Sequence, residues 1–518
     1  MSSQLTVPSN RIAVPVNEGN VVAYDPFVVA PIPSFKIPDV LEHGSDVEMS
    51  YLTRDMLIHQ YGSIVFTEGE FWCFADTHWV PLPDEILRQY AHKFDGKLYL
   101  MPNGKCGKVL LNKGRIDSIL HEVAMLMTVR DFFSDAPIGI NCLAGFVEIG
   151  PNGGTIHEHS PRHKQRHLIE AHYDAENPAQ PGPLLTKLLN GCFANLEPDE
   201  SAARILTLSQ IGGAAIAGMA TKLKKPKAAV LHGQTAENGK SQFLECFRAF
   251  LPGDAVCAFS IQQIGDERFI PRLSGKLLNT CDELSAAAVT SDTFKRVVTG
   301  EALSGREVRR LAVEVRPVAQ HVFSTNVLPG FIGGADRGVR RRLLIVPFER
   351  SIPDSEKVEN IGARIADEEA DGLLAWLIAG AVSLVQAGFI HESQACKQAL
   401  DDWLFNSDVV LAWLNEECEV TGKEEDAVPS SLAYSAFNVW AKGEGYDRIP
   451  NANVFKQRML AADPQSRIAW KATNKGKLIT GLRMGKPAES ADQNPIGTEA
   501  AQRFRLTGSG GGVIGTLS

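Results

Sequence analysis

The residues with the clearest chemistry lie in one short stretch, 231–241, with the sequence LHGQTAENGKS. A short apolar run precedes it and a segment of helical character, 242–250, follows it, so a glycine-containing loop is expected to join a strand to a helix. The amides of such a loop point toward an anion, Lys240 is a mobile cation, and Ser241 offers a hydroxyl to Mg²⁺. The pattern predicts a phosphate-binding loop for ATP.

The predicted loop is longer than usual. Five residues separate Gly233 from Gly239, whereas the common motif has four between its first glycine and the Gly-Lys pair. Either Gly233 begins a longer loop, or Gln234 supplies its first turn. The residues expected to contact ATP are Gly233, Thr235, Asn238, Gly239, Lys240, Ser241 and Gln242.

A pair of acids follows the stretch 275–281, which has the character of a buried strand. The pair is Asp282 and Glu283. Two adjacent carboxylates at the end of such a strand suit Mg-ATP chemistry, because one holds the metal with its water shell and the next activates the attacking water. We assign Asp282 to the metal and Glu283 to the water. A surface strand that ends in acids is the alternative for this segment by itself.

Two more segments carry groups that suit phosphoryl transfer. The strand 320–325 ends at Asn326. In ATPases of this architecture that strand lies between the phosphate loop and the acidic strand, which places the amide near the γ-phosphate. Further on, Arg341 and Arg342 precede an apolar run. A guanidinium from a neighbouring subunit assists phosphoryl transfer, so we expect one of these two to act in trans; a solvated basic face is the alternative.

A basic hairpin is predicted between the acidic strand and the Asn326 strand, because polar and apolar residues alternate over 304–316. Arg306, Arg309 and Arg310 would lie toward its tip. The phosphate backbone of DNA needs only charge and hydrogen-bond donors, which such a finger supplies. An ordinary charged hairpin is the alternative.

The composition is that of a soluble globular protein with several domains. The chain has 518 residues, of which 44% are hydrophobic and 22% charged. The net charge of -9 argues against a basic surface overall, but residues 222–350 carry 20 Lys and Arg against 13 Asp and Glu. This imbalance indicates a localised site for a polyanion.

Neither disulfides nor a membrane span is expected. The nine cysteines include no C-x-x-C pair, which favours reduced thiols in a cytosolic protein. No signal sequence is expected at the start, and the longest apolar stretch, 373–390, is interpreted as a buried helix. Five histidines gather at 157–172 without a Cys or a consistently placed carboxylate, which favours a polar surface or domain joint over a metal site.

The C-terminal third predicts a winged-helix-like domain. Three helices are expected at 409–417, 431–444 and 453–462, followed by a hairpin of strands 467–470 and 477–482. Lys456 and Arg458 on the third helix and Lys475 on the wing would suit DNA. A protein-docking module is the alternative.

The ordered set of motifs resembles the superfamily 3 helicases of the AAA+ type, specifically the phage- and plasmid-encoded primase-helicases related to the poxvirus enzyme. The order is specific, although no single motif is. The likeness extends roughly over residues 51–350. The matching segments are 232–241, 281–284, 298–306, 324–329 and 338–343, with 141–146 and 159–161 upstream.

The resemblance implies an α/β fold: a P-loop AAA+ core sheet flanked by helices, after an α+β N-terminal domain. It further implies a homo-hexameric ring in the cytoplasm of a bacterial or phage-infected cell, with ATP and Mg²⁺ at subunit interfaces. The ring would move along single-stranded DNA, typically 3′ to 5′, and unwind forked DNA. In this scheme Lys240 and Ser241 hold phosphate and metal, Asp282 and Glu283 serve metal and water, Asn326 senses the γ-phosphate, and Arg341 or Arg342 acts in trans.

Two departures from the family limit the expectations. The phosphate loop has its extra residue, and no D-x-D pair upstream of Lys240 suits the metals of a polymerising site. Primase activity is therefore not expected of this chain, and a separate primase or polymerase is an expected partner. An ATP-dependent DNA-binding initiator or helicase loader with little unwinding requires the same site, so the sequence leaves both functions open.

The domain organisation expected from these patterns has six parts. They are a flexible arm (1–48), an N-terminal domain (49–220), the ATPase core (221–352), a helical extension (353–400), the winged-helix-like domain (401–485) and a disordered tail (486–518).

Overall fold

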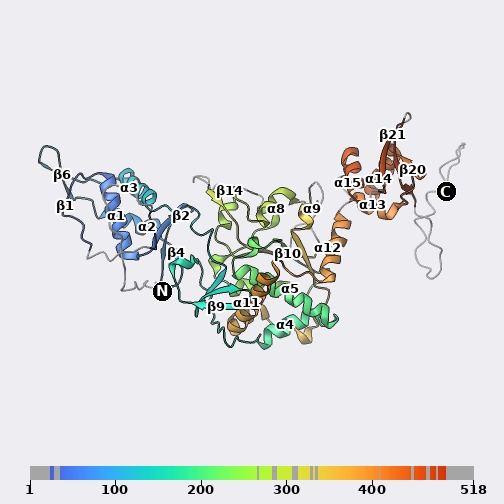
Figure 1. Ribbon diagram of the computed structural model, residues 1–518, viewed down its shortest axis with the longest axis horizontal. Helices are drawn as coiled ribbons and strands as arrows, with labels where there is room; N and C mark the ends of the chain where they lie inside the picture. Colours follow the sequence, from blue (N-terminus) through green and yellow to red (C-terminus); the bar gives the residue numbers. More distant parts are fainter. Residues whose placement is uncertain are drawn as a thin grey trace, which may run out of the picture. The chain divides into compact units, whose positions relative to one another are not determined.

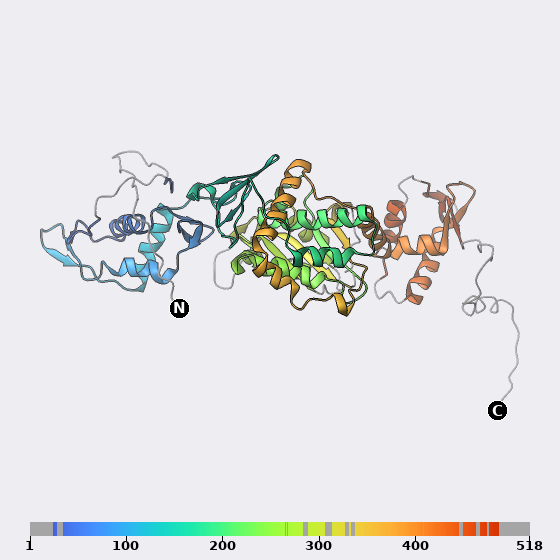
Figure 2. The same ribbon diagram turned by 90° about the horizontal axis from the view of Figure 1, so that it is seen from below.

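The structure, a computed structural model, describes residues 24–27, 35–264, 266, 268–282, 289–305, 313–326, 331–332, 337–407, 409–444, 449–462, 467–473 and 476–485. The chain divides into two units, Met1–Ser407 and Asp408–Ser518, and each is described by itself (Figures 1 and 2).

The N-terminal part of the first unit has its own hydrophobic core, which ends at Met127. Two three-stranded sheets and three helices surround it. Strands β3 (Glu70–Phe74) and β4 (Trp79–Pro81) pair antiparallel as a hairpin. The other elements are β1 (Val40–Leu41), α1 (Asp46–Tyr61), β2 (Ile64–Thr67), α2 (Asp84–His92), β5 (Leu98–Leu100), β6 (Cys106–Lys108) and α3 (Lys113–Leu126).

The central part of the first unit is built on a five-stranded sheet in which every pairing is parallel, in the order β11-β12-β16-β10-β18. The strand that precedes Asn326, β16, therefore lies between the strand of the predicted phosphate loop, β10, and the acidic strand, β12, as expected. The five strands are β10 (Ala228–His232), β11 (Val256–Cys257), β12 (Leu278–Cys281), β16 (Gln320–Thr325) and β18 (Leu343–Pro347).

Both faces of this sheet are covered. In β10, Ala229 and Leu231 belong to one hydrophobic cluster, whereas Ala228 and Val230 belong to another. Successive side chains of a strand point to opposite faces, so a strand buried on both faces is apolar at every position. Helices contribute to the first cluster from α4 (Pro183–Phe193), α5 (Pro198–Ile216), α6 (Lys240–Phe250), α10 (Ile361–Glu368) and α11 (Ala370–Ala387), and to the second from α7 (Ile261–Ile264), α8 (Ser291–Val298), α9 (Arg337–Arg340) and α12 (Gln394–Ser407).

Several short strands lie outside the main sheet. An antiparallel sheet joins β7 (Gly139–Cys142), β8 (Gly145–Gly150) and β9 (Gly153–His157). The predicted hairpin is confirmed at its base, where β14 (Leu303–Gly305) pairs antiparallel with β15 (Val313–Val315). Parallel pairing also joins β13 (Val289–Thr290) to β17 (Phe331–Ile332).

The boundaries of the parts differ from those expected. Residues from Ile140 onward, including α4 and α5, share the hydrophobic cluster of the sheet, so the part with its own core does not extend to residue 220. The second unit begins at Asp408 rather than at Asp401. The reason is α12, whose Leu400 and Trp403 pack in the second cluster with the sheet.

Helices α5 and α11 pack at backbone distance. A Cβ added at Gly213 would lie 2.5 Å from Ala381 N and 2.6 Å from Leu377 O. Among the described residues, α11 is the helix long and apolar enough to cross a membrane by length and composition. Its buried residues lie in the cluster that also contains α5, which agrees with the interpretation of 373–390 as a buried helix.

His321 in β16 makes stability depend on pH. Its ring is 2% exposed and stacks on Phe323, and its Nδ1 lies 3.2 Å from Asn279 Nδ2. Burial lowers the pKa of His321 from 6.5 to about 4. Between these pH values the unfolded chain binds a proton that the folded chain does not. The free energy of unfolding is therefore expected to fall as the pH is lowered through this range.

Urea unfolding of the wild type and of His321→Gln at about pH 7 and pH 5 tests this expectation. Glutamine does not titrate, so the wild type should lose more stability than the variant between the two pH values. Equal losses would show that His321 is not the group responsible.

The second unit contains the three predicted helices, α13 (Val409–Glu417), α14 (Ser430–Gly443) and α15 (Ala452–Ala462). It also contains the predicted hairpin, in which β21 (Ala469–Thr473) pairs antiparallel with β22 (Gly476–Thr480). Its core gathers Trp413, Phe437 and Phe455. Three short strands were not expected: β19 (Cys418–Val420), β20 (Ala427–Pro429) and β23 (Leu482–Met484).

Candidate nucleotide-binding site

The predicted phosphate loop joins β10 to α6 and ends at Gly239, which has a φ of 88° and precedes the first residue of the helix. Lys240 is 5% exposed. Its ammonium donates to Asn238 Oδ1 at 2.9 Å, Asn326 Oδ1 at 3.1 Å and Gly233 O at 3.2 Å. Burial lowers the pKa of Lys240.

The charge of Lys240 fits a phosphate. Among the described residues, no carboxylate lies within 4.0 Å of its ammonium, so its hydrogen-bond partners are neutral oxygens. A buried cation without an opposite charge favours an anion beside it. Lys240 opens α6, and the free amides at the start of a helix favour an anion at the same place.

Gly233 directly follows β10, at a point where no side chain fits. A Cβ at Gly233 would lie closer than 3.0 Å to Asn238 Nδ2, to Phe348 O and to the ammonium of Lys240. The buried amide of Asn238 crosses the inside of the loop, donating to Thr235 O at 2.7 Å and to Phe348 O at 3.1 Å. The absence of a side chain at position 233 is therefore what lets Asn238 and Lys240 approach each other.

The longer loop is tied to the segment that follows β18. Glu237 has a left-handed backbone, with a φ of 60°. Its carbonyl accepts from Ile352 N at 2.8 Å, and its carboxylate pairs with Lys357 Nζ at 2.9 Å. Glu237 thus joins the loop to the chain beyond β18. Thr235 and Ser241 are exposed, and Gln242 accepts from Gly362 N at 3.1 Å.

The ends of three neighbouring strands bring the predicted residues to one edge of the sheet. His232 is in register with Thr325, and Gly233 N donates to Thr325 O at 3.3 Å, which places Asn326 beside the loop. Cys281 is in register with Phe323, so Asp282 follows at the same edge. Glu283 lies outside the described residues.

Asp282 has a partner that sequence reasoning missed. Arg248 on α6 forms an ion pair with Asp282 and donates to Thr280 Oγ1 at 2.8 Å. The sequence indicated this contact only weakly, since Arg248 lies about two turns after Lys240 on the same helix. The carboxylate of Asp282, the predicted metal ligand, is therefore paired with the guanidinium of Arg248.

The arginines predicted to act in trans lie at the opposite edge of the sheet. Both precede β18, and Ala228 at the start of β10 is in register with Leu343. Arg342 is 8% exposed and donates to Gly338 O at 3.1 Å. A buried guanidinium does not reach another subunit, so this placement disagrees with the role expected of Arg342. Arg341 is exposed. It precedes β18 and lies at the edge of the sheet opposite the loop of its own chain.

A cavity of about 840 Å³ adjoins the loop. It is lined by Gly239 and Gln242, by Leu188 of α4, and by Ile352 and Val358 of the segment after β18. Charged residues, among them Glu237, Glu356 and Lys357, also line it. Its position next to the start of α6 and its apolar side chains suit a flat ring whose phosphates lie on the loop.

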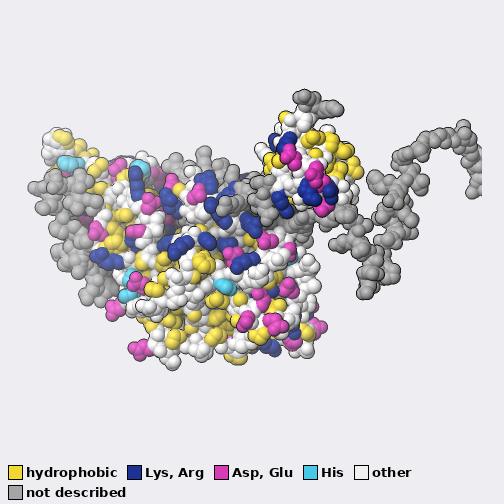
Figure 3. Space-filling model, turned by 45° about the vertical axis from the view of Figure 1, so that its right-hand side comes forward, with side chains coloured by type: hydrophobic (Ala, Val, Ile, Leu, Met, Phe, Trp, Pro, Cys, Tyr) yellow, Lys and Arg dark blue, Asp and Glu magenta, His cyan; other side chains and the backbone are white. Residues whose placement is uncertain are grey.

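The residues predicted to bind DNA are only partly described. Arg306, Arg309, Arg310 and Lys475 lie outside the described residues. On α15, Lys456 is exposed and lies over the Trp470 ring at 5.7 Å, and Arg458 is partly exposed. On the face shown in Figure 3, Lys and Arg side chains gather in a band across the middle of the body. A chain of net negative charge thus has a locally basic surface.

The histidines at 157–172 are spread over separate contacts. His157 pairs with Glu148 at 3.0 Å, and His159 Nδ1 lies 2.9 Å from Asn141 Oδ1. His167 Nε2 lies 2.8 Å from Gly275 O. This last contact joins the segment before α4 to the turn that precedes β12, so His167 connects two segments of the central part.

Comparisons with known proteins add little to this geometry. Residues 231–342 match a family described as a family of unknown function, DUF5906. A search of curated proteins gave no match. Two solved structures of the C-terminal region of NrS-1 in its apo A form are similar. One has 13% identity over 79% of this chain and 85% of that chain, with a TM-score of 0.40. The other has 12% identity over 83% and 99%, with a TM-score of 0.42. These values are too low to support an argument about function.

Proposed function

We propose that the chain is an ATP-dependent DNA helicase of a phage or mobile-element replication system, built on a P-loop AAA+ core. The observation that carries the proposal is the convergence of Lys240 and Asn326. Their side chains meet at 3.1 Å at the ends of adjacent parallel strands, with the acidic strand next in order. A cation and an amide brought together from separate strands suit recognition of a terminal phosphate better than either motif does by itself.

In this proposal the chain's own residues bind and orient ATP. The loop amides and Lys240 hold the phosphates, Asn326 contacts the γ-phosphate, and the cavity beside Gly239 takes the base. Glu283 activates the attacking water, and Arg341 of one subunit reaches the site of the next in a hexameric ring. Mg²⁺, when bound by Ser241 and Asp282, would neutralise phosphate charge. Mg²⁺ would then compete with Arg248 for the carboxylate of Asp282.

ATP hydrolysis and strand displacement, measured together, test the proposal. Hydrolysis is expected to be stimulated by single-stranded DNA and lost in Glu283→Gln, because glutamine does not accept the proton of the attacking water. The wild type is expected to unwind a fork with a 3′ tail and to leave a fork with a 5′ tail paired. DNA-stimulated hydrolysis without displacement on either fork would contradict a helicase and favour an initiator or loader.

A further inference from the structure

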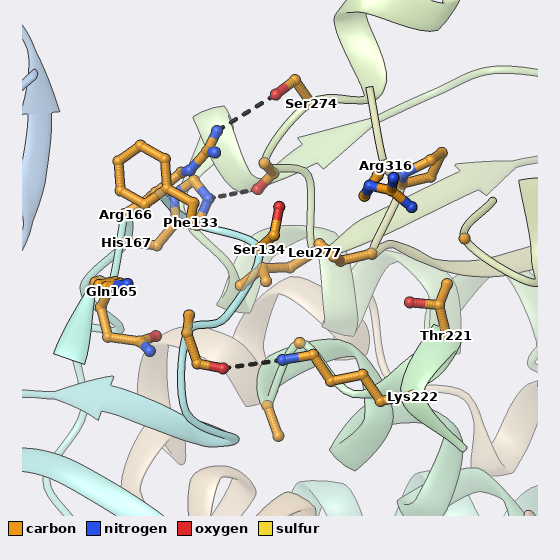
Figure 4. Close-up of a pocket in the computed structure, with 18 of the residues that line it drawn as sticks. Phe133, Ser134, Gln165, Arg166, His167, Thr221, Lys222, Ser274, Leu277 and Arg316 are labelled. Carbon is orange, nitrogen blue, oxygen red and sulfur yellow. Dashed lines mark hydrogen bonds between the residues drawn. The ribbon is translucent and has the colours of Figure 1, made fainter. Parts of the chain in front are cut away.

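A second cavity, of about 320 Å³, lies in the first unit and contains no residue of the phosphate loop (Figure 4). Its lining comes from the segments around Phe133 and Arg166, from the end of α5 with Thr221 and Lys222, and from the base of the β14–β15 hairpin. This volume lies in the range of small-molecule sites, about 300–1,000 Å³. The lining combines apolar and polar groups, as such sites do.

One wall of the cavity contains Arg166, whose charge is neutralised by contacts within the protein. The guanidinium of Arg166 lies 3.7 Å from the centre of the Phe133 ring and 5.0 Å from that of Trp72. It also forms an ion pair with Glu68 and donates to Ser274 Oγ at 3.4 Å. Because its charge and its donors are used within the protein, Arg166 serves as a preformed wall and not as a ligand-binding group.

The opposite side of the cavity has two cations, Lys222 and Arg316, that can still bind an anion. Lys222 Nζ donates to Ala136 O at 2.9 Å, and in the described part of the chain no carboxylate lies within 4.0 Å of it. Arg316 has Glu314 at 3.4 Å, and both side chains are more than half exposed. An exposed pair of this kind contributes little, so a stronger anion readily replaces Glu314.

Hydroxyl donors complete the polar part of the lining. Within the residues that the structure describes, the hydroxyls of Ser134 and Thr221 have no hydrogen-bond partner. Figure 4 shows the Thr221 hydroxyl directed toward the cavity, with Lys222 and Arg316 on different sides of it. Leu277 supplies an apolar surface between them.

We infer that this cavity binds a phosphate-bearing ligand of nucleotide size, with its phosphate held by Lys222 and Arg316 and its flat ring over Leu277. A charged donor from each of two segments and a neutral hydroxyl suit a phosphate. A free nucleotide and a nucleotide unit of single-stranded DNA share this chemistry. The inference does not depend on ATP hydrolysis, since the phosphate loop takes no part in the lining.

Equilibrium binding to the full chain tests the inference, with dTMP and a fluorescent oligothymidylate as probes. Lys222→Ala and Arg316→Ala are each expected to weaken binding about 10-fold, the effect of losing one charge-assisted hydrogen bond. Lys224→Ala and Arg296→Ala are matched controls outside the cavity and should bind as the wild type does. Unchanged urea unfolding midpoints would show that the variants are folded.

The probes separate the two sources of the ligand. If dTMP binds and the cavity variants weaken its binding, the ligand is a free nucleotide. If only the oligonucleotide binds and the cavity variants weaken its binding, the ligand is a unit of single-stranded DNA. The inference is overturned if neither probe binds, or if cavity and control variants bind equally. Lys240→Ala should leave dTMP binding unchanged, so failure of the proposed ATPase is distinguishable from failure of this site.

Discussion

Replacing Lys240 with alanine is expected to reduce the rate of ATP hydrolysis about 100- to 1,000-fold or more, the loss that follows removal of one preorganised donor from a developing charge. The ammonium already lies within 3.2 Å of Gly233 O and close to both amide oxygens. It therefore needs little reorganisation to meet a phosphate. Steady-state phosphate release at saturating ATP and Mg²⁺ measures the effect.

Lys224→Ala is the matched control, because Lys224 is exposed and precedes the proline that separates it from β10. It should hydrolyse ATP at the wild-type rate. If Lys240→Ala hydrolyses ATP within a few-fold of the wild-type rate, the loop is not the catalytic site. The loop could then bind a nucleotide only without hydrolysing it.

Arg204→Ala is expected to destabilise the first unit by about 1–3 kcal/mol, the usual cost of leaving a buried hydrogen-bond acceptor without its donor. Arg204 lies in α5 and is 2% exposed. It donates to Glu200 at 2.8 Å, to Pro347 O at 2.6 Å and to Glu349 at 3.1 Å. The guanidinium thus ties α5 to the end of β18, and its removal leaves a buried carbonyl without this donor.

Urea unfolding of the first unit, followed by tryptophan fluorescence, measures this loss. Arg364→Ala removes an exposed pair with Glu368 on α10 and is expected to change the free energy of unfolding little. Arg204→Met keeps the apolar stem and should recover part of the stability. Equal unfolding midpoints for Arg204→Ala and the wild type would show that the ion pairs do not hold α5 in place.

Local patterns in the sequence predicted the loop, the helix that follows it, the three helices of the second unit and two hairpins, because each depends on residues close together in the chain. The apolar runs that precede the predicted loop and follow Arg342 are strands β10 and β18, which the structure places side by side in one sheet, with β18 at its edge. The position of Asn326 beside Lys240 followed from strand order, which the resemblance supplied and the spacing of residues did not.

Contacts between distant segments were not predictable from local patterns. The pairs Arg248–Asp282 and Glu237–Lys357 join exposed-looking charges whose partners are set by tertiary packing. The burial of Arg342 was missed for the same reason, since a run of basic residues by itself indicates a solvated face. The second cavity was also missed, because its lining comes from at least three segments far apart in the chain.

The strand order has a consequence for how the chain is made. β10 lies between β16 and β18, both of which are synthesised later. Until Pro347 has left the ribosome, β10 emerges as an apolar strand with one or both edges unpaired. Such edges pair readily with other chains, so nascent chains that stop before β18 are expected to aggregate. For expression of fragments, a cut after α12 preserves the sheet, whereas a cut within 233–342 exposes it.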